Sequence, residues 1–479
     1  MYRLEKGAVL VCAGLLVWLV MLHPAIGVAD NGDFLRIMRT VGLDYLQADE
    51  SFEDKYFRFF HLQYAFHQMG LGGYISTQLI VVGAATLVGR IFSSVFDIRL
   101  LGSFYIALFL AGMYLLLRYS GLKQPAVRLV AALLFVFVFA DVGYAAYYNS
   151  LFGEPVTFVF ALLTGGFAFV LAAAERPSRW LLAGFFVCAV MLAGSKLQNA
   201  PVGFAIALLG FRLVQLREDR SWRRATVIGS ALLVLLSAAT YFAAPKELRV
   251  INQYQTVFYG IVKDSPDPQQ DLRELGIDPS LASLAGTDYF TPRSGMQPND
   301  PQMKPLFYDK ISHAKVALFY AKHPARFLQK LDRAAESGMY NRPMYLGNYA
   351  KSTGHEPGAV THTFGWWSKF KLKLPHSFAA VFLFFAAYVL TAVVLRLRSA
   401  DRRGKLLAEL FLVLALVGAI AMMVPLIGDG EADLSKHLFL YEVCFDAMVV
   451  SAVVFVINRI VAFFGLGRSS RSTASYRWR

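Results

Sequence analysis

Long apolar runs alternate with short polar linkers along most of the chain. A helix needs about 20 predominantly apolar residues to cross the roughly 30 Å hydrocarbon core of a bilayer. Apolar runs that match or approach this length lie near residues 8–26, 100–117, 128–141, 154–174, 180–195, 200–216, 225–244, 377–396, 405–427 and 438–460. The pattern predicts an all-α polytopic membrane protein with about ten transmembrane helices.

Composition supports this class. The 479 residues are 56% hydrophobic and 17% charged, well below the roughly 25% charged residues of soluble domains. The first apolar run has no small-residue cleavage pattern after it, so we interpret it as a spanning helix rather than a signal peptide. Cys12, Cys188 and Cys444 all fall inside apolar runs, which predicts no disulfide framework.

The distribution of positive charge predicts the orientation of the chain. Its net charge is +14, and most of the arginines lie in alternate linkers, around residues 118–128, 176–179, 212–224 and 396–405, and near both termini. By the positive-inside rule these segments and both termini are cytoplasmic. The charge therefore reports orientation and argues against a nucleic-acid partner.

One apolar stretch, residues 72–96, does not fit this orientation as a span, because counting it would place the 118–128 linker outside. We predict a helix at the outer membrane surface, within a long first external loop of residues 27–99. The predicted organisation is an N-terminal transmembrane module (1–244), an external soluble insertion before the eighth span (245–375), C-terminal transmembrane helices (376–465) and a basic cytoplasmic tail (466–479).

An acidic motif follows the first span directly. Asp30, Asp33 and Arg36 are spaced by three residues, so they would share one face if the segment were helical. A carboxylate at the membrane surface suits a reaction between a substrate dissolved in lipid and one dissolved in water. The alternative is a solvated helix start in which Asp30 or Asn31 is the N-cap.

Two lysines stand out in the other external loops. Lys196 and Lys436 are almost the only cations in short external loops, against the bias that orients the chain, and His437 adds a second donor beside Lys436. A cation held there indicates an anion to bind. The alternative is that the lysines reach lipid headgroups.

Other kinds of site have weaker signals. The histidines of the insertion lack metal-ligand spacing, and no Walker-type loop or dinucleotide fingerprint occurs, so we expect no zinc site and no nucleotide cofactor. Trp366 and Trp367 are expected to be interfacial anchors, with sugar stacking as the alternative.

Several segments together resemble a known superfamily. An acidic motif after the first span, a long first external loop with a surface helix ending in Asp97-Ile-Arg99, and the segment YYNSLFGEP (147–155) are similar to the GT-C glycosyltransferases. The segments DNGDF (30–34), YLGNY (345–349) and GEADLSKHLF (430–439) more narrowly resemble the bacterial WsfD-type glycan biosynthesis hexose transferases.

The resemblance implies an integral-membrane glycosyltransferase of the bacterial cytoplasmic membrane. Such an enzyme moves a sugar, here a hexose, from a polyprenyl-phosphate donor to a glycan or glycolipid acceptor on the extracytoplasmic face. In the superfamily an acidic residue after the first span is the base, a place that Asp30 occupies with Asp33 as its competitor. Many members have two adjacent acidic residues there, whereas this chain has Asp30-Asn31.

The chemistry of such a transfer predicts further site residues. A carboxylate takes the proton of the acceptor hydroxyl, and cations stabilise the phosphate leaving group. The candidates for the second task are Lys196, Lys436, His437 and Arg99, and Arg36 is a further candidate for substrate binding. The candidates for binding hydroxyls are Asn149, Glu154, Gln198 and Asn199. No cofactor is required, and the sequence leaves open whether Mg²⁺ or Mn²⁺ assists the Asp pair.

Two other classes remain as alternatives. A lipid-linked glycan flippase or transporter would also span the membrane many times, but we would expect ionisable groups within its spans and internal repeats. A glycan polymerase or ligase of another fold would use similar lipid-linked sugars and would also have an external, cation-rich site.

Overall fold

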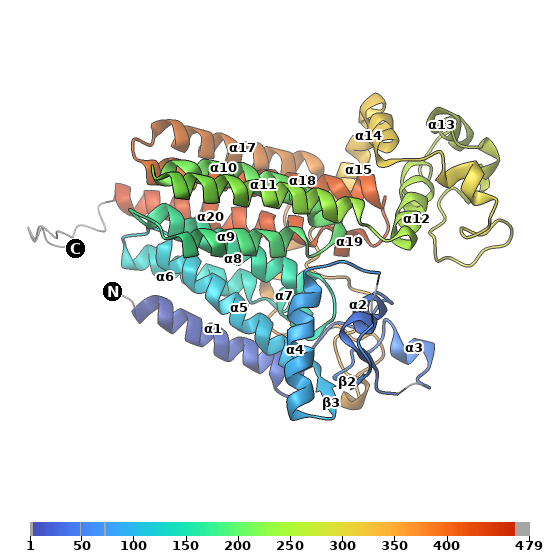
Figure 1. Ribbon diagram of the computed structural model, residues 1–479, viewed down its shortest axis with the longest axis horizontal. Coiled ribbons are helices and arrows are strands. Elements are labelled where there is room, and N and C mark those ends of the chain that lie inside the picture. The colour runs from blue at the N-terminus through green and yellow to red at the C-terminus, as the bar shows by residue number, and fades with distance from the viewer. Residues whose placement is uncertain (1–2, 48, 71–72, 465–479) are drawn as a thin grey trace, which may run out of the picture.

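The computed structural model describes residues 3–47, 49–70 and 73–464. Long helices lie side by side in one bundle, with the remaining elements gathered at one of its ends (Figure 1). The long helices are α1 (Arg3–Met21), α5 (Ile98–Tyr119), α6 (Pro125–Phe139), α8 (Glu154–Ala173), α9 (Arg179–Ala193), α10 (Ala200–Arg212), α11 (Arg220–Phe242), α17 (Phe378–Arg398), α18 (Arg402–Gly428) and α20 (Phe439–Phe463).

Within the described residues, eight helical segments are long and apolar enough to cross a membrane. A ninth is added if α6 and the following segment Val142–Asn149, which bends away by 52°, form one broken span. The sequence predicted about ten. The difference lies in α9, whose 15 residues reach only about 22 Å at 1.5 Å per residue, although α9 runs beside α8 in the bundle (Figure 1).

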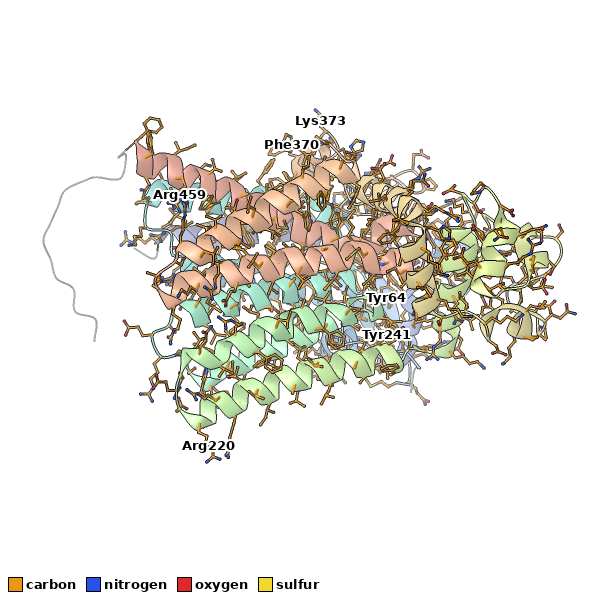
Figure 2. All side chains as sticks on the ribbon, turned by 90° about the horizontal axis from the view of Figure 1, so that it is seen from above. Tyr64, Arg220, Tyr241, Phe370, Lys373 and Arg459 are labelled. Atoms are coloured by element: carbon orange, nitrogen blue, oxygen red, sulfur yellow. The ribbon has the colours of Figure 1, made fainter. Side chains whose placement is uncertain are left out.

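The two predicted ends of the bundle are distinct. Helix α1 begins and α20 ends at the end opposite the large insertion (Figure 1), and Arg220 and Arg459 lie at that same end (Figure 2). Helix α4 (Gln78–Phe92) crosses the long helices steeply, which is the orientation that the predicted surface helix requires. The assignment of the two ends to cytoplasm and exterior stays a prediction.

The first part of the insertion has a hydrophobic core of its own. Buried residues of this core include Tyr254, Phe258, Leu272 and Phe307. Its elements are α12 (Lys246–Tyr254), η4 (Gln255–Ile261), α13 (Pro268–Leu275), η5 (Pro279–Leu284), η6 (Lys304–Tyr308), α14 (His313–Lys322) and α15 (Pro324–Ser337). A separate core explains how a polar segment of this length folds beside the membrane helices.

The end of the insertion packs differently, because it is joined to the first external loop. Ile26 and Tyr349 form an antiparallel bridge, and the amides of Gly27 and Ala29 donate to the carbonyls of Asn348 and Gly347 at 3.1 and 3.0 Å. A side chain at Gly347 would meet the carbonyl oxygen of Arg58 at 1.9 Å, so only glycine fits. The YLGNY segment is therefore held against the chain that leads into the acidic motif.

The first external loop contains a small antiparallel sheet that the sequence did not predict. Its strand order is β1 (Leu43–Tyr45), β2 (Gln63–Phe66) and β3 (Val95–Asp97). Two short helices, α2 (Phe34–Val41) and α3 (Phe52–Lys55), lie in the same loop. The sheet fixes the loop around Asp30, because Tyr45 of β1 donates a hydrogen bond to that carboxylate.

Candidate functional site

A large cavity of about 930 Å³ lies where the first external loop, the insertion and the ends of the membrane helices meet. Its polar lining includes Asp33, Arg36, Glu154, Lys196, Gln198, Lys436 and His437. Apolar residues of α12 and α18, among them Leu248, Ile251, Val424 and Ile427, line another part of it. A cavity with a few convergent polar groups and an apolar wall is the usual form of a small-molecule site.

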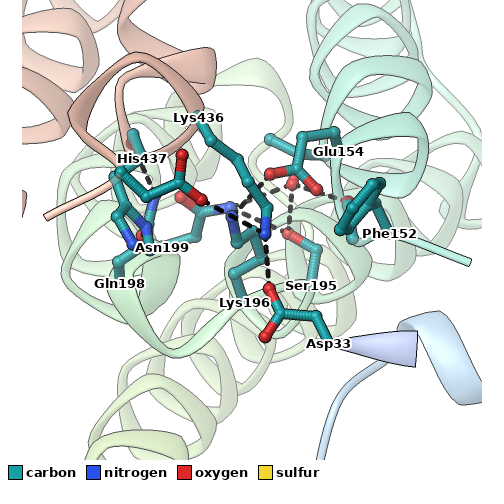
Figure 3. Close-up of polar contacts among 12 residues, drawn as sticks. Asp33, Phe152, Glu154, Ser195, Lys196, Gln198, Asn199, Lys436 and His437 are labelled. Atoms are coloured by element: carbon teal, nitrogen blue, oxygen red, sulfur yellow. Dashed lines mark hydrogen bonds and ion pairs between the residues drawn. The ribbon is translucent and has the colours of Figure 1, made fainter. Parts of the chain in front are cut away.

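Asp33 faces this cavity between two cations. It precedes α2 and forms an ion pair with Arg36, one turn later, at 2.9 Å. Its second carboxylate oxygen pairs with Lys436 from the loop before the last span, as Figure 3 shows. Burial disfavours the charged carboxylate, but Lys436 and Arg36 outweigh burial and hold the pKa of Asp33 well below its usual range.

Asp30 has different surroundings. It is fully buried, lies before the helix rather than on it, and does not line the cavity. One carboxylate oxygen accepts the amides of Gly32 and Phe34 at 2.7 and 3.1 Å, and the other accepts the Tyr45 hydroxyl at 2.5 Å. Burial raises the pKa of Asp30 although these hydrogen bonds oppose the rise.

The two carboxylates therefore do not share one helical face, as the sequence spacing suggested. The N-cap of α2 is Asp33 rather than Asp30 or Asn31, and its side chain makes no capping hydrogen bond. Asp30 nevertheless accepts the amide of Phe34, the first residue of α2. The catalytic role of Asp30 stays a prediction, whereas Asp33 is the carboxylate of the motif that lines the cavity.

The predicted cations are each held by a carboxylate. Lys196 donates to Glu154 at 2.7 Å, and His437 lies 2.9 Å from Asp429. The side-chain oxygen of Gln198 accepts a hydrogen bond from Nδ1 of His437 at 2.6 Å, and its amide nitrogen donates to the backbone carbonyl of His437. Charges are thus paired throughout this wall of the cavity (Figure 3).

Lys436 is the most enclosed of these cations, with 2% of its surface exposed. Besides Asp33 it faces Asp433 at 3.5 Å and lies over the ring of Phe152, 4.3 Å from the centroid. Burial lowers the pKa of Lys436, but Asp33 and Asp433 outweigh burial and raise it above its usual value. The lysine is therefore charged at neutral pH.

Asp433 connects the three segments that carry the sequence resemblance. It lies in the loop 430–439 and has a left-handed backbone with φ of 44°. Its carboxylate accepts the Tyr345 hydroxyl at 2.5 Å and the Asn31 amide at 3.3 Å. The DNGDF, YLGNY and GEADLSKHLF segments, far apart in the chain, therefore meet at one wall of the cavity.

Three predicted site residues lie elsewhere. Arg99 pairs with Asp97 at 2.6 Å outside the cavity. Asn149 is buried and donates to the carbonyls of Val20 and Ile26. Asn199 is buried and donates to Thr157 and Ser195. Neither asparagine lines the cavity, and both amide nitrogens donate within the protein, whereas the side-chain oxygen of Asn149 has no partner among the described residues. Hydroxyl binding by these two residues stays a prediction.

The sequence reasoning also missed residues that the structure brings to the cavity. Asp429 and Asp433 lie in the same short loop as Lys436, and Tyr345 lies in the YLGNY segment. The sequence prediction rests on the cations of this loop and does not include its carboxylates as their partners. Alternating charges in one short external loop are the signal that would have found them.

A second group of charged residues lies buried near the start of α20. Asp446 accepts the Tyr144 hydroxyl at 2.5 Å and the Trp367 indole at 2.7 Å, and lies 3.3 Å from the ammonium of Lys371. Trp367 is therefore not an interfacial anchor, whereas Trp366 is 63% exposed. Both oxygens of Glu442 lack a hydrogen-bond partner among the described residues.

In the part of the chain that the structure describes, no three His, Cys, Asp or Glu side chains are arranged to hold a metal ion. The three cysteines, all of them among the described residues, are buried and free.

The family model of the YfdI N-terminal transmembrane domain matches residues 4–471. The chain belongs to this family. The family is one of GT-C-like membrane glycosyltransferases. No curated protein and no solved structure gave a significant match. Membership agrees with a polytopic helical membrane protein whose cavity opens at one end of the bundle.

Proposed function

We propose that this YfdI-family protein transfers a sugar, specifically a hexose, from a polyprenyl-phosphate donor to a glycan or glycolipid acceptor on the outer face of the bacterial cytoplasmic membrane. The observation that carries the proposal is the placement of Asp33, Lys436 and Lys196 together on one cavity wall beside apolar residues of α12 and α18. A lipid phosphate has both a charged group and an apolar chain, and this cavity offers a complement to each. The narrower resemblance to WsfD-type transferases supports the hexose.

Asp33 is the base in this proposal, in place of Asp30. A base must reach the acceptor hydroxyl within about 3 Å or through one water, and Asp33 lines the cavity while Asp30 does not. The proton moves from the acceptor hydroxyl to the Asp33 carboxylate as the acceptor oxygen bonds to the anomeric carbon. The bond from that carbon to the phosphate oxygen breaks, and its electron pair stays on the phosphate.

In this proposal the two lysines exchange their carboxylate partners for the phosphate of the donor. Before the donor binds, Lys436 is shared by two carboxylates and Lys196 is held by Glu154. A bound phosphate competes for both lysines, because charge-assisted hydrogen bonds to phosphate oxygens are strong. When Lys436 turns to the phosphate, Asp33 loses its main counter-charge and becomes a better base. Donor binding and activation of the base are therefore coupled.

The test compares Asp33→Asn with Asp30→Asn in the purified full-length protein. Both proteins are supplied with radiolabelled polyprenyl-phosphate hexoses and a membrane glycolipid fraction as acceptor. Asp33→Asn is expected to lower transfer at least about 100-fold, since Asn cannot take the proton, and Asp30→Asn to lower it less. Full activity of Asp33→Asn would remove Asp33 as the base, and a wild-type protein that transfers no sugar would overturn the proposed function.

A further inference from the structure

Four aromatic side chains cluster on the lining of the cavity, and three of them are exposed. Phe52 and Tyr56 have ring centroids 4.9 Å apart, and Phe57 lies 6.4 Å from each of them. Tyr345, from the distant YLGNY segment, lies 6.3 Å from Phe57. All four line the cavity that contains Asp33. We refer to Phe52, Tyr56, Phe57 and Tyr345 as the aromatic rim.

The aromatic rim is exposed to an unusual degree. Phe52, Phe57 and Tyr345 are 69%, 37% and 48% exposed. Large apolar side chains that stay in water at the edge of a polar cavity mark a binding site more often than a packing need. By contrast, the nearby aromatic residue Tyr64 is fully buried.

The backbone holds the rim in place at a local conformational cost. Phe57 has φ of 68°, a left-handed conformation that is strongly disfavoured for a bulky residue. Its amide donates to the carbonyl of Asp30 and its carbonyl accepts the amide of Gly347, both at 2.8 Å. The same hydrogen bonds therefore join the rim to the acidic motif and to the YLGNY segment. Strain that the surrounding structure maintains is typical of functional sites.

We infer that the aromatic rim is the acceptor subsite, where the face of a pyranose ring of the acceptor glycan stacks on Phe52 and Phe57. The inference rests on the proposed function and names a site within it. Pyranose rings present C–H groups on one face, which suit the negative face of an aromatic ring. Two ion pairs, Arg58–Glu53 and Lys351–Asp54, lie outside the cavity lining on residues close to Phe52 and Phe57 in the chain or paired with them. Their charged groups offer hydrogen bonds to ring hydroxyls.

An alternative occupant, the prenyl chain of the donor, is less favoured by the placement of the residues. The apolar wall on α12 and α18 is already suited to a hydrocarbon chain. Helices α12 and α3 lie on different sides of the same end of the bundle (Figure 1). The rim combines rings with charged groups, which a hydrocarbon chain would desolvate without compensation.

Two substitutions remove rings with little risk to the fold. Phe52→Ala acts on the most exposed ring of the rim. Phe57→Asn removes a ring at the left-handed position, which Asn adopts more readily than Phe. Trp366→Ala is the matched control, because Trp366 is also exposed but does not line the cavity.

The probe is a set of methyl glycosides of glucose, galactose and mannose, with saturation-transfer NMR on the full-length protein in a detergent without a sugar headgroup. We expect saturation transfer from aromatic protons to the sugar C–H face, weakened about 3- to 10-fold by Phe52→Ala and Phe57→Asn and unchanged by Trp366→Ala. The inference would be overturned if the wild-type protein gave no saturation transfer to the glycosides. It would also be overturned if Phe52→Ala, Phe57→Asn and Trp366→Ala gave equal signals.

Kinetics separate this inference from the proposed function. In the transfer assay the rim variants should raise KM for the acceptor and leave KM for the donor unchanged. A raised donor KM alone would assign the rim to the lipid and overturn the inference. If the wild-type protein transfers no sugar but the glycosides still bind at the rim, the proposed function fails and the saccharide site stands. If the wild-type protein transfers sugar but the rim variants leave the acceptor KM unchanged, the proposed function stands and the inference about the rim fails.

Discussion

Two groups of paired charges near the start of α20 differ in what surrounds them. In the first, Asp33 and Lys436 meet on the wall of a cavity of about 930 Å³. In the second, Asp446 and Lys371 meet where neither side chain has any exposed surface. Lys371 also donates to Asn341 at 2.9 Å. Both groups join a segment that lies between membrane helices in the sequence to the last long helix or to the loop before it.

The difference in access between the two ion pairs indicates different roles, ligand binding for the first and stabilisation of the fold for the second. A charge that borders a cavity can exchange its partner for a ligand, since a phosphate or hydroxyl can reach it. A sealed pair has no such exchange, and removing one member leaves the other buried and uncompensated, which is strongly destabilising. We therefore expect the cavity group to determine activity and the sealed group to attach the end of the insertion to the bundle.

The largest expected effect is on stability. Lys371→Met should lower the free energy of unfolding by about 3–5 kcal/mol, because it leaves Asp446 without its counter-charge. Thermal unfolding of the purified protein, followed by intrinsic fluorescence, measures the change. The double variant Lys371→Met/Asp446→Asn should recover part of the lost stability. The folded protein of each variant should have the same KM for acceptor and donor as the wild-type protein. A loss of activity without a loss of stability would contradict the comparison.

The next effect is on catalysis. Lys436→Gln should lower sugar transfer about 10- to 100-fold, since a preorganised cation for the leaving phosphate is lost. Lys123→Gln, in a linker at the far end of the bundle, is the control. If both variants lost activity equally and slightly, Lys436 would be a residue that only contacts lipid headgroups.

Much of the architecture was predictable from the sequence because membrane spans depend on length and hydropathy, which are local properties. The surface helix followed from parity among the basic linkers. The site was only partly predictable, because pairing depends on long-range packing. Lys436 and Asp33 are 403 positions apart, and no local pattern indicates which carboxylate a lysine will meet. The burial of Asp30 likewise depends on Tyr45, which belongs to a sheet too short to recognise in the sequence.

The pH dependence of sugar transfer should show whether Lys436 leaves Asp33 when the donor phosphate binds. Burial opposes ionisation of Asp33, and Lys436 and Arg36 hold its pKa low in the free protein. When Lys436 pairs with the donor phosphate instead, the pKa of Asp33 should rise. Because kcat reports the enzyme–substrate complex and kcat/KM the free enzyme, the acidic limb of kcat should lie at higher pH than that of kcat/KM, by about one unit or more. In Lys436→Gln the two limbs should coincide. Coincident limbs in the wild-type protein would show that Lys436 does not leave Asp33.

The smallest expected effect belongs to a third kind of pair, one that lies neither in the cavity nor in the sealed group. Arg99 was predicted to stabilise the leaving phosphate, but it pairs with Asp97 outside the cavity, and its side chain is 40% exposed. Exposed pairs contribute about 0–1 kcal/mol, so Arg99→Gln should change transfer less than about twofold. Arg36→Gln is the informative partner, because Arg36 pairs with Asp33 and lines the cavity, and its loss should change transfer severalfold. If Arg99→Gln lowered sugar transfer more than Arg36→Gln, a position on the cavity wall would not distinguish the charged residues needed for activity from those that only stabilise the fold.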